Sequence, residues 1–182
     1  IYTETGGRAT GETPLGTGAI EVYGELRVRG AQGSLFNAST GSHNNVINLR
    51  PGGTVRLHDA DGLVATNFLG AGDQGRWGDT VGLDLNGGNF IYNGPANLNG
   101  VETIGDITAR KGGTLQVFRN STASTVQLNV GDISRAERGV LTIAYNSGFL
   151  GIPATTPLSY ERITAQTISG AAIVKVGTTN NG

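Results

Sequence analysis

The sequence predicts an all-β fold, a β-solenoid of about six coils. Three observations lead to this prediction. The stretch from Leu83 to Phe118 contains one unit twice: an alternating strand, a Gly-Gly corner and a second alternating strand. Glycine corners recur at positions 24, 52, 87, 112 and 139, which are 28, 35, 25 and 27 residues apart. No window carries the i, i+3, i+4 apolar spacing of a helix, and such units bury both faces only when they stack on one another.

The first unit follows an irregular lead-in. Residues 1–18 are rich in Gly and Thr and show little periodicity. Ala19–Tyr23 and Glu25–Arg29 then alternate between apolar and polar residues on either side of Gly24. Alternation with a period of two indicates strands with one buried face, so residues 19–182 are expected to form the coils of a single domain.

The second unit is followed by the longest irregular stretch. Its strands are expected at Val46–Leu49 and Thr54–His58, and its corner is Pro51 followed by Gly52 and Gly53. Pro-Gly is a common turn pair. The loop insertion near 59–80 contains the only Trp, and it explains why one spacing between corners is as long as 35 residues.

The later units repeat the same plan. Two of them have double glycines at their corners and are joined by residues 93–100, whereas the fifth corner is a charged segment that ends at Gly139. The double glycines are Gly87 with Gly88 and Gly112 with Gly113. The expected strands are Leu83–Asn86, Asn89–Tyr92, Ile107–Lys111, Thr114–Phe118, Val126–Val130 and Val140–Tyr145, and Arg162–Val176 forms the last coil.

The main alternative fold is a β-sandwich, whose strands also recur every 8–12 residues. The recurring Gly-Gly corner favours the solenoid, and six coils spaced by about 4.8 Å would form a rod roughly 30 Å tall. Disorder, the other interpretation of a chain with 31 glycines, does not fit the regularly spaced Val, Ile and Leu residues.

Composition excludes several classes of function. The net charge is −1 and acids and bases are interspersed, so no basic stripe suggests nucleic acid. No apolar run approaches the roughly 18 residues of a membrane span. The chain has no Cys, which excludes a disulfide scaffold and zinc-thiolate sites. It begins without an initiator Met or a signal peptide, and is expected to be a segment of a larger secreted or surface protein.

Two blocks resemble the autotransporter-associated β-strand repeats of large bacterial surface and secreted proteins. The first is Pro14–Gly30, a Leu-Gly-small-Gly segment followed by a strand, a glycine and a second strand. The second is Leu83–Gly94 together with Val101–Ile107, which contain Leu-Asn-Gly-Gly-like and Glu-Thr-x-Gly blocks. The resemblance implies a right-handed parallel β-helix, located extracellularly or at the bacterial cell surface, and it carries no shared catalytic residues.

The candidate metal ligands are Asp59 and Asp61, which precede Gly62 as in the opening of a calcium loop. No third acid or bidentate Glu follows at the right distance, so a solvated turn is the alternative and no cofactor is expected. His43 and His58 have no visible partners for a triad or a metal site.

A carbohydrate-active enzyme, either a polysaccharide lyase or a glycosidase, is the alternative function. Hydrolysis needs two carboxylates about 5–9.5 Å apart. Asp84 and Asp106 stand at different offsets from their corners and should not stack, and Asp79 approaches Asp84 only if its loop folds back. Two acids clustered with Arg76, Trp77 or Lys111 in one groove would favour the enzyme.

Trp77 and Arg76 are the candidate recognition residues, because a Trp on a polar loop can stack against a sugar ring. In the alternative interpretation, Trp77 folds back and covers the edge of a coil. A third hypothesis is an adhesin that binds a sugar through the 59–80 loop.

The function expected is that of a non-enzymatic extracellular structural module, a rigid stalk or fibre-forming unit with a possible adhesive role. The ends of a solenoid expose unpaired backbone groups unless a cap covers them. The expected partners are therefore adjacent coils of the same long chain or other copies, with glycans or a host or matrix surface as further candidates.

Overall fold

The computed structural model describes residues 2–3, 19–29, 35, 47–58, 76–79, 81–95, 99–119, 125–145, 161–169 and 173–178. All regular structure within these ranges is β-strand, and they contain no helix long and apolar enough to cross a membrane. The strands are β1 (Tyr2–Thr3), β2 (Ile20–Val22), β3 (Glu25–Arg29), β4 (Ile47–Leu49), β5 (Thr54–His58), β6 (Leu83–Asn93), β7 (Gly100–Ile104), β8 (Ile107–Phe118), β9 (Val126–Val130), β10 (Ile133–Arg135), β11 (Val140–Tyr145), β12 (Glu161–Ala165), β13 (Ile168–Ser169) and β14 (Ile173–Thr178).

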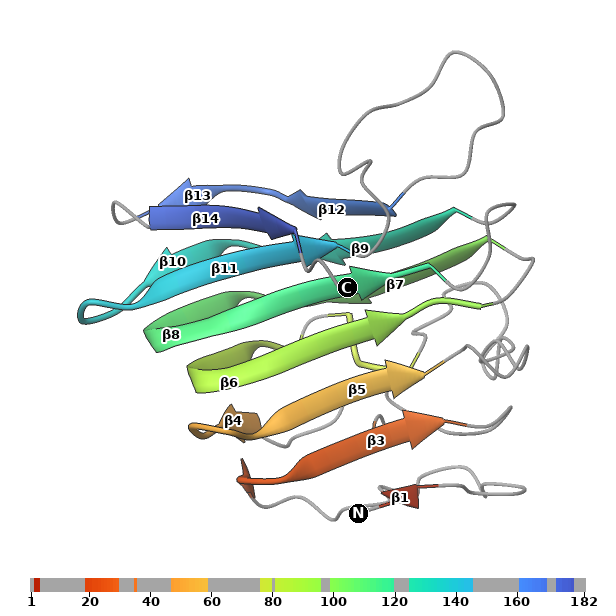
Figure 1. The fold of residues 1–182 in the computed structure, drawn as a ribbon, viewed down its shortest axis with the longest axis horizontal. Coiled ribbons are helices and arrows are strands. Elements are labelled where there is room, and N and C mark those ends of the chain that lie inside the picture. Colours follow the sequence, from red (N-terminus) through yellow and green to blue (C-terminus); the bar gives the residue numbers. More distant parts are fainter. Residues whose placement is uncertain are drawn as a thin grey trace.

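The described strands pair in parallel throughout. They form an 11-stranded sheet and a 3-stranded sheet, the latter in the order β12-β9-β7. Figure 1 shows β3, β5, β6, β8, β11 and β14 stacked in chain order, with β7 and β9 behind them. Because parallel neighbours need a long connection, each pairing joins a strand to the equivalent strand of another segment of the chain. The prediction of an all-β chain with parallel strands is confirmed, and the antiparallel sandwich does not fit these pairs.

Equivalent residues of successive strands lie in columns. The register aligns a column of branched apolar residues across six strands, from β2 to β13. Its members are Ile20, Ile47, Leu83, Ile107, Ile133 and Ile168. The four inner members are at most 2% exposed, whereas Ile168, on an edge strand, is 56% exposed.

A second column fills the other side of the core. Leu26, Val55, Phe90 and Leu115 align across β3, β5, β6 and β8, and all are buried. Leu128 and Val130 of β9 belong to the same apolar cluster. A fully buried side chain of this size stabilises the fold by about 1.5–3 kcal/mol, so the columns supply the main apolar contribution to folding.

The double glycines allow the chain to bend sharply between inner columns. Gly87 has φ of +91°, a conformation that L side chains rarely adopt. A Cβ at Gly88 would lie 2.8 Å from both the carbonyl oxygen of Gly53 and the Cβ of Leu49. The other two pairs behave in the same way: Gly52 and Gly112 have a positive φ, and a Cβ on Gly53 or Gly113 would collide with backbone. The predicted corners at these positions lie inside continuous strands in β6 and β8, where the register shifts between Leu85 and Asn89.

The first and fifth corners depart from this plan. At Gly24 no atom lies within 4 Å of the position that a Cβ would occupy. At the charged corner Glu137 has φ of +56°, while a Cβ on Gly139 would collide with the carbonyl of Ala109. Both positions turn the chain, but only Gly139 is sterically required to be glycine.

The sequence does not predict the 3-stranded sheet as a separate layer. It predicts residues 93–100 only as a connection between two units, but β7 begins at Gly100 and pairs with β9 from Val126 onward. The predicted lead-in at 1–18 and insertion at 59–80 lie outside the described residues, apart from β1 and residues 76–79.

The steric role of the second corner glycine is testable with Gly88→Ala. The new methyl group meets backbone on one side and Leu49 on the other, so we expect a loss of about 1–3 kcal/mol in the free energy of unfolding. Gly24→Ala is the matched control and should change stability by less than about 0.5 kcal/mol. Urea unfolding of both variants makes the comparison, and equal midpoints would contradict this view of the corner.

Candidate functional site

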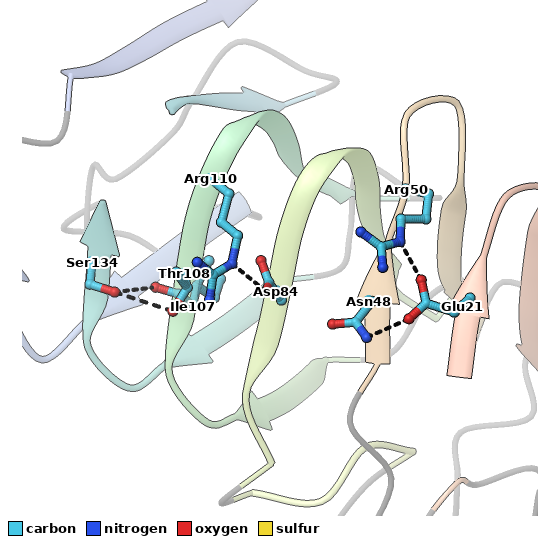
Figure 2. A network of polar contacts seen from close by, with 8 residues as sticks. All are labelled: Glu21, Asn48, Arg50, Asp84, Ile107, Thr108, Arg110 and Ser134. Atoms are coloured by element: carbon cyan, nitrogen blue, oxygen red, sulfur yellow. Dashed lines mark hydrogen bonds and ion pairs between the residues drawn. The ribbon is translucent and has the colours of Figure 1, made fainter. Parts of the chain in front are cut away.

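Opposite charges alternate along one outer face of the large sheet (Figure 2). Glu21 on β2 accepts hydrogen bonds from Asn48 Nδ2 at 2.8 Å and from Arg50 Nε, with which it forms an ion pair. Asp84 on β6 accepts a hydrogen bond from Arg110 Nε at 2.6 Å. Each of these contacts joins neighbouring strands, so the row ties successive layers of the sheet together.

The electrostatics of this row follow from the alternation. The hydrogen bonds from Arg50 and then Asn48 hold the pKa of Glu21 below its ordinary value of 4.5. The pKa of Arg50 is raised chiefly by its hydrogen bond to Glu21, and the charge of Asp84 adds to the effect. Asp84 raises the pKa of Arg110 in the same way. The order Glu21, Arg50, Asp84, Arg110 therefore favours the charged form of both arginines and of Glu21.

A second charged cluster lies on β3 and β5. Glu25 accepts hydrogen bonds from Arg27 and Arg56, with Nε–Oε1 distances of 3.0 and 2.9 Å. Burial acts to raise the pKa of Glu25, but the hydrogen bonds from Arg56 and Arg27 outweigh it and leave the pKa below 4.5. The cluster therefore adds a second charged link between adjacent strands.

Trp77 and Arg76, the predicted recognition residues, are fully buried. The Trp77 ring meets Phe90 edge to face at 5.3 Å between centroids, and its Nε1 donates to the carbonyl of Val81 at 2.8 Å. The buried carboxylate of Glu102 accepts hydrogen bonds from the backbone amides of Arg76 and Trp77 at 3.0–3.1 Å. These contacts place both residues in the core, as in the interpretation in which Trp77 folds back, and both side chains are shielded from solvent.

A groove of about 600 Å³, lined by both polar and apolar residues, lies where β7, β9 and β12 end. Its lining includes Asp79, Asp106 and Gln166, together with one residue from the same register position of each strand. Those equivalent residues are Thr103, Asn129 and Thr164. Asn129 Nδ2 donates to Thr103 Oγ1 at 3.3 Å, and Thr164 Oγ1 donates to Asn129 Oδ1 at 2.7 Å.

A second row of contacts, beyond the strand ends, links the same strand levels through Asp106, Asp132 and Thr167. Asp106 Oδ1 accepts a hydrogen bond from the amide of Asp132 at 2.8 Å, and Asp132 Oδ1 accepts one from Thr167 Oγ1 at 2.7 Å. Gly105 and Gly131 lie between the two rows and line the groove with backbone. The groove thus presents oriented hydroxyl, amide and carboxylate groups at successive strand levels.

Sequence reasoning did not single out this groove as a site. Thr103, Asn129 and Thr164 are common surface residues, and their shared position becomes visible only once the register is known. One signal was available, because residues on adjacent strands are 26 residues apart in the pairs Thr103–Asn129 and Asp106–Asp132.

The three candidate catalytic acids do not lie together: Asp84 is on the charged face of the large sheet, and Asp79 and Asp106 are at the groove. Asp84 pairs in register with Thr108 rather than Asp106, and it binds Arg110 on the charged face. Asp79 and Asp106 line one groove, so the structure does bring two carboxylates to a common surface. Lys111 lies elsewhere, in a hollow shared with Arg110, Glu137 and Arg138.

The structure describes only one of the histidines and acids considered as metal ligands, His58. Asp59, Asp61 and His43 lie outside the described residues. His58 Nδ1 lies 3.0 Å from Asn93 Nδ2 and so accepts a hydrogen bond from that amide. Within the described ranges no three His, Cys, Asp or Glu side chains are grouped to hold a metal ion.

Comparison with models of protein families, with curated protein sequences and with solved structures finds no match to this chain.

The charged row is testable by pH titration of Arg50→Gln. Because the pKa of Glu21 is lowered on folding, its ionisation stabilises the fold above pH 4.5, and this contribution is lost as the pH falls through the folded pKa. Removing Arg50 should raise the pKa of Glu21 towards 4.5. NMR titration of the Glu21 carboxyl measures the shift.

The control for this titration is Arg138→Gln, which removes an exposed arginine at another corner and should leave the pKa of Glu21 unchanged. An unchanged Glu21 pKa in Arg50→Gln would contradict the role assigned to the ion pair.

Proposed function

We propose that the chain is a right-handed β-solenoid of about six coils that serves as a rigid, non-enzymatic structural module. The observation that carries this proposal is the column from Ile20 to Ile168, in which each strand pairs in parallel with the equivalent strand of the next segment. Right-handed winding is expected because parallel strands of one sheet are joined that way in about 98% of crossovers.

The contacts between layers support a load-bearing role. Backbone hydrogen bonds link each layer to the next, and most of the side-chain contacts described above run in the same direction. The Glu21–Arg50 and Asp84–Arg110 pairs cross between strands on one face, and the Asp106–Asp132–Thr167 series does so at the groove. An extending force would have to break many of these contacts together, which is what stiffness along the stack requires.

The open sheet edges indicate the expected partners. Within the described part of the chain β12, β13 and β14 each pair with a single strand, as do β1, β2 and β7. Such edges are templates for further strands. We propose that they receive further coils of the same chain or a second copy, in a protein located extracellularly or at the bacterial cell surface, as the resemblance to autotransporter-associated repeats suggests.

A carbohydrate-active enzyme is the second candidate, and one observation favours it. Asp79 and Asp106 line the same groove, and a glycosidase uses two carboxylates that flank its substrate. Against this, the described residues that line the groove include no Lys, Arg or His to assist a lyase. The structural module therefore has the stronger support.

The edge-pairing proposal is testable with Ile168→Asp. The purified chain should associate end to end as its concentration rises, because Ile168 is 56% exposed on edge strand β13 and another apolar layer would cover it. A charge at this position should weaken association. Sedimentation velocity and negative-stain images measure both effects.

The control here is Val140→Asp, a substitution of a partly exposed residue on β11, which is paired on both sides. It should associate like the unsubstituted chain. A compact monomer that does not associate at any concentration would argue against open edges as binding surfaces.

A further inference from the structure

We propose that the groove at the ends of β7, β9 and β12 is a binding site for a neutral oligosaccharide, whose chain lies along the stacking direction of the three strands. The groove volume of about 600 Å³ falls within the range of roughly 300–1,000 Å³ that small-molecule sites occupy. The site includes Asp79 from the end of the 59–80 stretch, and it is distinct from the charged face of the large sheet.

One wall offers hydrogen-bond donors held in fixed orientations. Thr103 accepts from Asn129, and Asn129 accepts from Thr164 and also from Gln127 Nε2 at 2.6 Å. In these contacts the Thr103 hydroxyl proton and the second Nδ2 proton of Asn129 are not used, since a hydroxyl and an amide each carry further capacity. Both groups line the groove and can donate to sugar oxygens.

The other wall offers an acceptor. The contact with the Asp132 amide uses only Oδ1 of Asp106 and fixes the carboxylate, so that Oδ2 can accept from sugar hydroxyls. A Cβ on Gly131 would collide with Asp106 Oδ1. The glycine therefore keeps the carboxylate in place and leaves the floor of the groove open.

The spacing of the groups matches a sugar chain. Neighbouring strands are about 4.8 Å apart, which is close to the length of one pyranose unit in an extended oligosaccharide. The three strand levels therefore cover about 10 Å, enough for roughly three sugar units. Similar polar groups recur at each level, as a ligand with repeating hydroxyls requires.

The charge of the groove selects among sugars. Of the described residues that line it, the ionisable ones are Asp79 and Asp106, and both are acids. The carboxylate of Asp106 repels uronate and sulfate groups, whereas neutral hydroxyls can donate to its Oδ2. The geometry thus favours a neutral oligosaccharide over an anionic one.

The experiment is isothermal titration with four neutral trisaccharides, cellotriose, maltotriose, mannotriose and tri-N-acetylchitotriose, and with trigalacturonic acid as the anionic probe. We expect at least one neutral trisaccharide to bind and trigalacturonic acid not to bind. Asp106→Ala and Asn129→Ala should each lower the affinity for the neutral trisaccharide by roughly tenfold, since each removes hydrogen bonds to the sugar. Gly131→Ala should lower this affinity by a similar factor, because the new methyl group displaces the Asp106 carboxylate.

The matched control is Asn89→Ala, which removes the same side chain from the large sheet, where Asn89 lies in register with Thr54 and Thr114. It should bind the ligand with unchanged affinity. Circular dichroism and thermal unfolding of each variant identify those that have lost the fold. If Asp106→Ala is one of them, Asp106→Asn, which keeps the shape of the side chain, takes its place. Failure of all four neutral sugars to bind, tighter binding of trigalacturonic acid, or equal affinity in the Asp106 and Asn89 variants would overturn the proposal.

Discussion

The structure depends on the backbone hydrogen bonds between parallel strands, which place equivalent residues of successive segments directly beside one another. A single segment of this chain has two faces and too little apolar surface to bury both. Pairing in register solves this problem, because each layer covers the open edge of the next and each inner residue packs on its own equivalent. The column from Ile20 to Ile168 is the clearest result of this constraint.

The same constraint explains the glycines and the polar rows. Where the chain bends between inner columns, the second glycine of a corner lies against the backbone of the layer before it, and at Gly88 and Gly113 there is no room for a Cβ. On the outside, register brings Glu21 beside Arg50 and Asp84 beside Arg110. The polar row of the groove arises in the same way, because Thr103, Asn129 and Thr164 occupy one position of three strands.

The sequence predicts the strands in which the apolar residues are the buried ones and the polar residues are the more exposed ones. The strands on both sides of Gly52 alternate in burial, those before Gly87 and Gly112 begin with the same alternation, and all of them lie close to their expected bounds. Strand β7 escapes prediction because its polarity is inverted: Glu102 is 2% exposed while Val101 is 60% exposed. Trp77 is misleading for a similar reason, since its polar sequence neighbours suggest a surface loop although the side chain is buried. Only the fold reveals that Glu102 satisfies the backbone amides of this turn.

The central claim, parallel stacking in register, is tested most directly by disulfide crosslinking, since the chain has no Cys. Thr108 and Ser134 are register partners on β8 and β10, with their hydroxyl oxygens 3.3 Å apart. A chain carrying Thr108→Cys and Ser134→Cys should crosslink within the monomer under mild oxidation. A chain carrying Asn48→Cys and Ser134→Cys, whose positions are separated by the intervening strands β6 and β8, should not. Crosslinking of the second pair in preference to the first would contradict the account.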